Sequence, residues 1–258
     1  MRVDFEKYQG AGNDFIILNG ITSGIKLSQS QIESMCNRHF GVGADGLIII
    51  EKAENYDFFM RYFNSDGLEG TMCGNGGRCA ANFAYRNTIA GEKIKFLAID
   101  GVHYAEIKDE NVSISMKSNG VIKKLMDGYF LDTGSPHFVK FVDNIDNINI
   151  TEKGKEIADE LRFSPNRTNV NFVEIKPGQI KTSTFERGVE NETLACGTGA
   201  VAIAIALHQA GIIKVTNVKL FAKGGVLKVS FDHNNNNYTN IKLEGPAEFV
   251  FKGCIYIE

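Results

Sequence analysis

Two cysteines in this sequence begin the same short pattern. The chain reads Cys73-Gly74-Asn75-Gly76 and Cys196-Gly197-Thr198-Gly199, and an alanine-rich segment with a helical pattern follows each stretch. A helix N-terminus carries unpaired N–H groups and a partial positive charge, so it lowers the pKa of a thiol and attracts a carboxylate. Glycine lets backbone N–H groups approach a ligand closely. The pattern therefore predicts, twice, a reactive thiol beside a carboxylate site.

Two such sites suit the inversion of a stereocentre. Removing a proton from one face of a carbon and returning it to the other needs a base and an acid on opposite sides. A thiolate and a thiol fill these roles, and the helix N-termini would stabilise the charge that develops in the carboxylate. We therefore expect Cys73 and Cys196 to be the catalytic pair, facing one carbon in a shared cleft. The sequence contains no apparent metal-ligand cluster or pyridoxal-phosphate lysine, so we expect the reaction to need no cofactor and no metal.

The cysteine pattern belongs to a longer internal repeat. Glu69 and Glu192 each lie four residues before their cysteine. Further upstream, 10–13 (GAGN) resembles 134–137 (GSPH), and these stretches begin 63 and 62 residues before the cysteines. Two landmarks that keep their spacing indicate a duplication. The predicted fold is therefore α/β (mixed, largely antiparallel strands), in two pseudo-symmetric domains, each with strands wrapped around a central helix that starts at its cysteine.

Local patterns predict the elements of these domains. Helices are expected at Ser28–Phe40, Gly74–Ala90, Thr151–Arg162 (with Thr151 as cap) and Gly197–Ala210. The last is apolar nearly all round and should be buried. Strands are expected at Phe15–Leu18, Leu47–Ile50, Phe58–Phe63, Val112–Met116, Val218–Phe221 and Glu248–Ile257, with a hairpin loop at Asn234–Asn237.

Composition narrows the class of protein. The chain has 258 residues, 43% hydrophobic and 23% charged, which are globular values. A net charge of −3 argues against a nucleic-acid partner, and no apolar run reaches membrane-spanning length. The N-terminus has no apolar signal-peptide core, so we expect a cytoplasmic protein whose five cysteines are reduced. Cys36, Cys79 and Cys254 are expected to be inert, buried residues.

Together these motifs resemble those of diaminopimelate epimerases. Matching stretches run from 7–15 (KYQGAGNDF) to 244–247 (EGPA), and the most specific are 63–67 (FNSDG), 72–76 (MCGNG), 186–188 (ERG) and 195–199 (ACGTG). The resemblance implies an isomerase that interconverts LL- and meso-diaminopimelate, on the route to lysine and cell-wall peptides. It also implies that the last strand returns to the first domain, so that the domains comprise 1–117 plus 247–258, and 118–246.

The resemblance further implies the residues of the site. His137 should support Cys73, and Glu186 should support Cys196. The expected substrate-binding residues are Asn13, Asn64, Gly74, Asn75, Asn169, Glu186, Arg187, Gly197 and Thr198. A substrate with two carboxylates and two ammonium groups needs an arginine for the distal carboxylate, and carbonyls or carboxylates for the ammonium groups. The expected partner is this small molecule, and a homodimer is an assembly that the sequence leaves open.

Two positions depart from the family pattern. Ser135 replaces an asparagine, and Gly46 lies where many members have a glutamine. Both changes remove polar side-chain contacts of the family pattern and leave the catalytic pair untouched.

Other interpretations of these residues stay open. Asn13 and Asn64 could be turn residues, His137 a surface histidine, and Glu186 with Arg187 an exposed pair on a strand. The cysteine motifs alone would also fit proline or hydroxyproline racemases, although these substrates offer Arg187 no distal carboxylate. In a third interpretation the chain is a redox sensor or non-catalytic binding protein, with Cys73 and Cys196 forming a disulfide. Redox pairs more often have the spacing Cys-x-x-Cys, which is absent.

Overall fold

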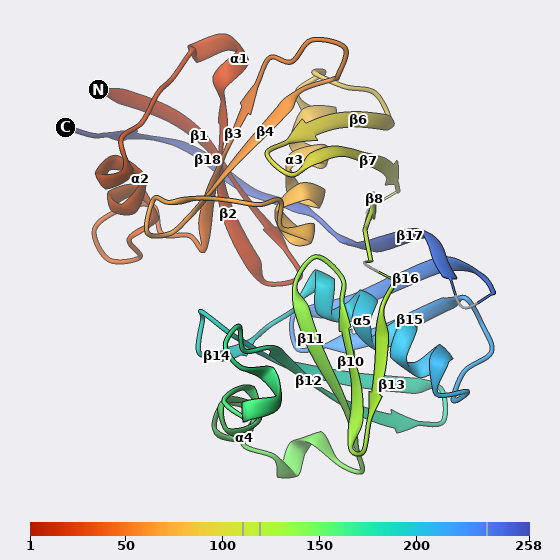
Figure 1. Cartoon of the computed structure of the whole chain (residues 1–258). Helices are drawn as coiled ribbons and strands as arrows, with labels where there is room; N and C mark the ends of the chain where they lie inside the picture. Colours follow the sequence, from red (N-terminus) through yellow and green to blue (C-terminus); the bar gives the residue numbers. More distant parts are fainter. Residues whose placement is uncertain (110, 119, 236) are drawn as a thin grey trace. The chain divides into compact units, whose positions relative to one another are not determined.

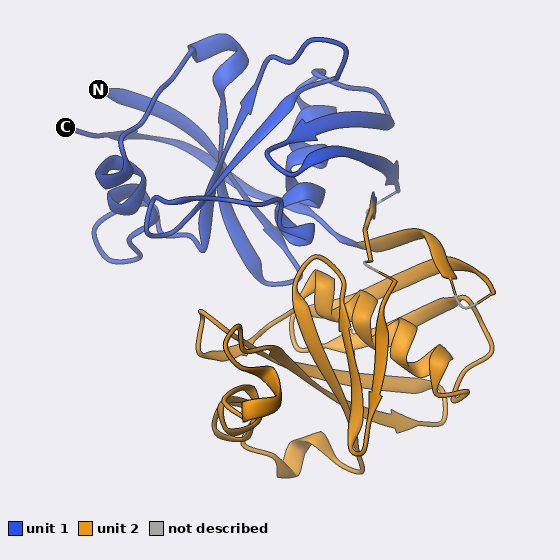
Figure 2. Ribbon diagram, viewed as in Figure 1, with its two compact units in different colours: residues 1–114, 245–258 blue, residues 115–244 orange. Residues whose placement is uncertain are grey.

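The computed structural model describes residues 1–109, 111–118, 120–235 and 237–258. The chain forms two compact units (Figure 2), of which unit 1 comprises Met1–Ile114 with Gly245–Glu258, and unit 2 comprises Ser115–Glu244. The sequence predicted the changes of domain after 117 and after 246, whereas the units change after 114 and after 244. The assignment of these segments to two related epimerase domains stays a prediction.

Unit 1 is built from strands around one long helix (Figure 1). Its elements are β1 (Arg2–Gly10), β2 (Asn13–Asn19), α1 (Gly20–Ser23), α2 (Gln29–Cys36), β3 (Gly46–Glu51), β4 (Phe59–Asn64), β5 (Glu69–Gly70), α3 (Gly74–Arg86), β6 (Lys93–Ala98), β7 (Gly101–Lys108), β8 (Asn111–Ser115) and β18 (Glu248–Tyr256).

Unit 2 has the same plan. Its elements are β9 (Ile122–Leu125), β10 (Gly128–Asp132), β11 (Pro136–Val142), η1 (Ile145–Asn147), α4 (Ile150–Ala158), η2 (Leu161–Phe163), β12 (Asn169–Lys176), β13 (Gln179–Glu186), β14 (Asn191–Thr193), α5 (Gly197–Gln209), β15 (Asn217–Ala222), β16 (Gly225–Asn234) and β17 (Asn237–Pro246).

Strand pairing repeats from one unit to the other. In unit 1, β1–β2 is antiparallel, β2–β3 parallel, β3–β4 antiparallel, β4–β6 parallel and β6–β7 antiparallel. In unit 2, the same sequence of directions occurs in β10–β11, β11–β12, β12–β13, β13–β15 and β15–β16. β18 pairs with β1 as β9 pairs with β10, both antiparallel. The predicted α/β class with largely antiparallel strands is confirmed, and the final strand does return to the first unit.

A helix lies at the centre of each unit and buries many small or apolar side chains. α3 packs against β1, β2 and β7, and buries Cys79, Ala80, Ala81, Phe83 and Ala84. α5 packs against β11, β12 and β16, and every residue from Gly199 to Leu207 is buried. The prediction that this apolar segment is enclosed is therefore confirmed.

Most predicted strands are confirmed, but several helix ends differ. α2 ends at Cys36 rather than Phe40, because the Asn37 side chain accepts hydrogen bonds from the N–H groups of His39 and Phe40 and forms a turn. α3 ends at Arg86 rather than Ala90, and Thr88 there adopts a left-handed conformation.

The cap of α4 was predicted wrongly. The helix begins one residue after Asn149, whose side chain accepts a hydrogen bond from the N–H of Glu152. Thr151 lies inside the first turn, and its hydroxyl donates to Asn191 Oδ1 at 2.6 Å. A second error concerns Cys254, which is exposed rather than buried. It pairs with the equally exposed Asp4 on the outward face of β18 and β1.

The predicted hairpin at Asn234–Asn237 joins β16 to β17, which pair antiparallel with Asn234 opposite Asn237. Residue 236 of that prediction lies outside the described residues.

Candidate active site

Each of the two predicted catalytic cysteines is the N-cap of the central helix of its unit. Cys73 precedes α3 and Cys196 precedes α5, and both have an extended backbone and a partly buried side chain. Both helices are 13 residues long, so their first N–H groups have the full N-terminal dipole behind them. The predicted carboxylate-binding pairs, Gly74–Asn75 and Gly197–Thr198, supply these N–H groups.

In unit 1, two asparagines surround Cys73. Its thiol donates to Asn13 Oδ1 at 3.7 Å, and Asn75 Nδ2 donates to the same oxygen at 3.3 Å. Asn75 is oriented by Arg78, a fully buried residue whose guanidinium donates to Asn75 Oδ1 at 2.9 Å and to the Gly74 carbonyl at 3.3 Å. The structure thus brings three predicted site residues into one hydrogen-bonded group, and Asn13 is more than a turn residue.

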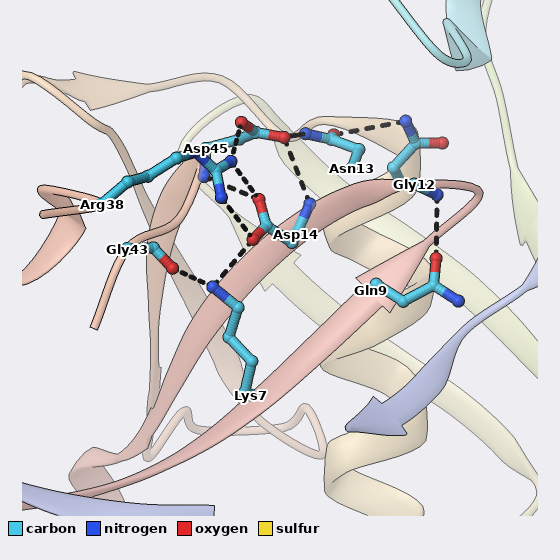
Figure 3. Close-up of polar contacts among 9 residues, drawn as sticks. Lys7, Gln9, Gly12, Asn13, Asp14, Arg38, Gly43 and Asp45 are labelled. Atoms are coloured by element: carbon cyan, nitrogen blue, oxygen red, sulfur yellow. Dashed lines mark hydrogen bonds and ion pairs between the residues drawn. The ribbon is translucent and has the colours of Figure 1, made fainter. Parts of the chain in front are cut away.

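The amide nitrogen of Asn13 binds to a network of charged side chains (Figure 3). Asn13 Nδ2 donates to Asp45 Oδ2 at 2.7 Å, and Arg38 bridges Asp45 and Asp14 at 2.7 Å each. Lys7 lies 2.8 Å from Asp14 and donates to the carbonyl of Gly43. Burial raises the pKa of Asp14, but hydrogen bonds from Arg38 and Lys7 outweigh it and hold this pKa at about 2. Asp14 is therefore charged at neutral pH.

Asn64 lies at the exposed end of β4, where Tyr62 contacts it. The Tyr62 hydroxyl donates to Asn64 Oδ1 at 3.0 Å, which leaves the amide nitrogen of Asn64 as its donor end. A Cβ atom at Gly46 would lie 2.7 Å from the Tyr62 ring and 2.7 Å from the Phe63 carbonyl. The Tyr62 ring therefore occupies the space beside Gly46, so this position has no room for a larger side chain.

In unit 2, hydrogen-bond donors surround the Cys196 sulfur. Gly199 N donates to Sγ at 3.4 Å, and the Thr198 hydroxyl lies 3.5 Å from Sγ. A Cβ atom at Gly199 would lie 2.6 Å from Asn171 Oδ1 and 3.3 Å from Sγ, so the close approach of this N–H requires glycine.

A buried histidine fixes the direction of the Thr198 hydrogen bond. Asn171 Nδ2 donates to the Phe138 carbonyl at 3.1 Å, and its Oδ1 accepts from Thr184, so Nδ2 also faces His137 Nδ1 as a donor at 3.1 Å. His137 must then carry its proton on Nε2, which donates to Thr198 Oγ1 at 2.9 Å. While it accepts this bond, the Thr198 hydroxyl still has its own proton to donate, and Cys196 Sγ lies 3.5 Å away.

His137 stays neutral in this position. Burial, and secondarily the positive charge of Arg187, lower its pKa to about 3. Its side chain is fully enclosed, which rules out a surface loop histidine. That His137 supports Cys73 stays a prediction, because the two residues belong to different units. The link of His137 to Cys196 through Thr198 was not predicted from the sequence.

The remaining predicted residues line the same end of unit 2. Asn169, opposite His137 in the pairing of β11 and β12, accepts from the Arg187 backbone N–H at 3.0 Å. Its Nδ2 donates to Ser135 Oγ at 3.1 Å, so the serine that departs from the family pattern orients this asparagine. Arg187 donates to the carbonyl of Asn166, and Glu186 is the last residue of β13.

Sequence reasoning missed four residues that orient the predicted ones: Asp45, Tyr62, Arg78 and Asn171. Asn171 had a detectable signal, because polar residues two positions apart in an apolar strand point to the same face. Tyr62 had the same signal, since it lies two residues before Asn64 on β4, and Arg78 lies three residues after Asn75 on α3. Only Asp45 is identified by a partner distant in the sequence, Asn13.

Among the described residues there is no group of three or more His, Cys, Asp or Glu side chains arranged to hold a metal ion. Within the same part of the chain, every helix is too short or too polar to cross a bilayer.

Solved structures share this fold. A phenazine biosynthesis protein of the PhzF family from Bacillus anthracis matches 100% of both chains with a TM-score of 0.78 at 14% identity. A hydroxyproline epimerase from Agrobacterium vitis matches 98% of this chain and 91% of its own with a TM-score of 0.68 at 12% identity. At these identities the likeness establishes the fold alone.

Sequence comparison establishes the family. The diaminopimelate epimerase from Flavobacterium psychrophilum is 46% identical over 253 residues, covering 96% of this chain and 98% of its own. The profile of the family described as diaminopimelate epimerase matches residues 5–122 and 129–250, which include both cysteine motifs. This chain therefore belongs to the diaminopimelate epimerase family.

Proposed function

We propose that this isomerase interconverts LL- and meso-diaminopimelate by moving the α-proton between Cys73 and Cys196, without a cofactor. The observation that carries the proposal is that each unit of a diaminopimelate epimerase family member has a cysteine as the N-cap of its central helix. In the reaction one thiolate takes the α-proton, and the other cysteine, as a thiol, donates a proton to the opposite face. The cysteines then have exchanged protonation states, and the reverse reaction starts from that form.

The reacting carboxylate would bind at the helix N-termini. The N–H groups of Gly74, Asn75, Gly197 and Thr198 belong to first turns, where backbone donors have no intrahelical acceptor. When the α-proton leaves, negative charge moves into this carboxylate. Fixed donors and two helix dipoles then stabilise the transition state more than the ground state.

The distal end of the substrate would be recognised by Arg187 and its neighbours. Arg187 is held by its side-chain bond to Asn166 and its backbone bond to Asn169. A guanidinium binds a carboxylate through two parallel hydrogen bonds. The carboxylate of Glu186 and the amide oxygens of Asn64 and Asn169, each of which can accept a second hydrogen bond, offer acceptors for an ammonium. Proline and hydroxyproline lack this distal amino-acid group, so the alternative substrates leave these residues unused.

We also propose that the enzyme works in the cytoplasm on this small molecule, with no nucleic-acid or membrane partner. Cys73 and Cys196 must stay reduced for the proposed chemistry, which requires a reducing compartment. Light scattering on the purified chain would show whether it acts as a homodimer.

The test is deuterium exchange at the α-carbon. Incubation in D₂O with LL-diaminopimelate, meso-diaminopimelate, proline and hydroxyproline, each in parallel, should give deuterium incorporation and epimerisation only with diaminopimelate. Exchange with proline but not diaminopimelate would reassign the substrate. Absence of exchange with all four, in reduced protein, would contradict the epimerase function.

A variant sharpens the assignment of the distal group. Arg187→Lys should raise KM for diaminopimelate by about tenfold or more, because an ammonium loses the bidentate geometry although it keeps the charge. Arg167→Lys is the matched control, since Arg167 forms an ion pair with Glu190 at 2.6 Å. Equal KM values for Arg187→Lys and the unmodified enzyme would remove Arg187 from the site.

A further inference from the structure

The two cysteines differ in the direction of their hydrogen bonds. The Cys196 sulfur caps its helix by accepting from Gly199 N at 3.4 Å, and the Thr198 hydroxyl, which can donate to it, lies 3.5 Å away. The Cys73 side chain does not cap α3, and its thiol instead donates to Asn13 Oδ1 at 3.7 Å. Donors favour a thiolate, whereas an acceptor favours a thiol that still has its proton.

The acceptor beside Cys73 is set by Asp45. An amide of Asn13 could present either its oxygen or its nitrogen to the sulfur. Asp45, paired with Arg38 at 2.7 Å, is a carboxylate that only accepts, so it takes the Asn13 nitrogen at 2.7 Å. The oxygen must then face Cys73, where the donor of Asn75 also meets it at 3.3 Å. Figure 3 shows the Asn13 amide bonded to Asp45, which is paired with Arg38.

We propose that Asp45 is a positioning residue that keeps Cys73 in the thiol form through the Asn13 amide, so that in the resting enzyme Cys73 is the acid and Cys196 the thiolate base. The names acid and base rest on the proposed function, but the protonation states do not. The first turnover then moves one proton from substrate to Cys196 and one from Cys73 to substrate. A proton exchange with solvent restores the resting state.

Other charged groups near Cys73 in unit 1 do not decide its state alone. Arg78, in the first turns of α3, attracts the Cys73 thiolate, but its guanidinium already donates to Gly74, Asn75 and Pro246. Asp100 accepts from the N–H of Met72, beside Cys73, and pairs with His103 at 3.1 Å. Cys79 is buried on the same helix, and burial raises the pKa of its thiol to about 12, so it is neutral.

The experiment is the pH dependence of alkylation by iodoacetamide, followed for each cysteine by peptide mass spectrometry on the full chain without substrate. In the unmodified protein, Cys196 should react at lower pH than Cys73. Cys254 is exposed and serves as a reference, and Cys36 and Cys79 are buried and should stay unmodified as long as the chain is folded. Faster reaction of Cys73 than of Cys196 at neutral pH would overturn the proposal.

The variant Asp45→Asn tests the positioning role. It allows the Asn13 amide to turn its nitrogen to the sulfur, so alkylation of Cys73 at pH 7 should rise by about tenfold, equivalent to one pKa unit, while Cys196 keeps its profile. Asp14→Asn is the matched control, because it removes one charge from the same network and leaves the bond between Asn13 and Asp45. No change in Cys73 for Asp45→Asn, or an equal change for Asp14→Asn, would overturn the positioning role.

A double variant separates positioning from simple charge. In Asn13→Ala the acceptor is gone, so Cys73 should already be reactive, and adding Asp45→Asn should change its rate less than twofold. A further tenfold rise would show that Asp45 acts by its field rather than through Asn13. None of these measurements needs turnover, so a failed exchange assay with diaminopimelate would contradict the proposed function and leave this inference standing.

Discussion

The two halves of this molecule share a scaffold and differ in the partners of the catalytic sulfur. Asn13 and His137 occupy the same place in the repeat, at the start of β2 and β11, and Asn75 and Thr198 both follow the cysteine by two residues. In unit 1 this pair presents an oxygen to Cys73, and in unit 2 it offers a hydroxyl to Cys196. The repeat thus preserves the helix N-terminus at which we propose the carboxylate binds, while differences at two positions give the sulfurs different partners.

The helices behind the cysteines differ in a related way. Five residues after the cysteine, α3 has the buried Arg78 and α5 has the buried Val201. Arg78 orients Asn75 and reaches the carbonyl of Pro246 at 3.3 Å. The α5 helix needs no such charge, because the orientation in unit 2 comes from the Phe138 carbonyl through Asn171 and His137. Asn75 and Thr198 occupy equivalent positions, but a buried charged side chain orients the first and neutral hydrogen-bonded side chains orient the second.

The largest expected effect comes from removing either sulfur. Cys73→Ala and Cys196→Ala should each lose at least about 10³-fold in epimerisation, within the range for general acid–base catalysis. Each variant should still exchange the α-proton of one stereoisomer with D₂O, and the two variants should prefer different stereoisomers. Exchange is followed by mass spectrometry on LL- and meso-diaminopimelate. If both variants exchange the same stereoisomer, the sulfurs do not serve opposite faces. Cys36→Ala is the control.

A smaller effect is expected from Thr198→Val, which keeps the shape and removes the donor to Cys196. A hydrogen bond to a charged group contributes about 1.5–3 kcal/mol, or roughly 1–2 pKa units. The acidic limb of the pH profile of kcat/KM should therefore move to higher pH by about one unit. At pH values below this limb, kcat/KM should be about tenfold lower than in the unmodified enzyme. Thr239→Val, on the exposed face of β17, should leave the limb unchanged. If the acidic limb does not move in Thr198→Val, the hydrogen bond from Thr198 does not stabilise a Cys196 thiolate.

His137 should make stability depend on pH. Its folded pKa of about 3 lies below the unfolded value near 6.5, so below pH 6.5 the unfolded chain binds a proton that the native state does not. The free energy of unfolding should fall as pH decreases from about 6.5 to about 3. Urea unfolding between about pH 5.5 and 7 measures this slope, because Asp14 and Glu190, whose pKa values are lowered to about 2, lose their contribution to stability only as the pH falls toward their unfolded pKa values of about 4.

The matched variants are His137→Gln and His208→Gln. Burial also lowers the pKa of His208, so each substitution should remove part of the slope, and the fully enclosed His137 should account for more of it. His39→Gln changes an exposed residue and should leave the slope intact. A larger loss for His208→Gln than for His137→Gln would contradict the buried neutral state of His137.

The smallest effect is expected from Tyr62→Phe. The ring still fills the space beside Gly46, but the hydrogen bond to Asn64 at 3.0 Å is lost. One neutral hydrogen bond contributes about 1 kcal/mol, so KM for diaminopimelate should rise about fivefold while kcat changes little. Tyr256→Phe, at the exposed end of β18, is the control. An unchanged KM would show that Asn64 does not depend on Tyr62.

Much of the fold was predictable because its signals are local. The duplicated cysteine pattern identified both helix starts, and the apolar surface of Gly197–Ala210 identified a buried helix, because caps and helical periodicity involve neighbours within a few residues. The errors in the end of α2 and the cap of α4 also have local causes, because a neighbouring side chain formed the hydrogen bonds instead. Asn37 ended α2 early with its own side chain, and Asn149 took the cap that Thr151 was expected to form.

The sequence by itself predicted the residues that we propose to carry the chemistry: two cysteines at two helix N-termini, with the asparagines, His137 and Arg187. Only the tertiary structure decided what each side chain offers to its sulfur. The bond between Asn13 and Asp45 joins residues 32 apart, and the bond between Asn171 and His137 joins residues 34 apart. An amide can present a donor or an acceptor, and an imidazole can carry its proton on either nitrogen, so only folded partners fix these choices.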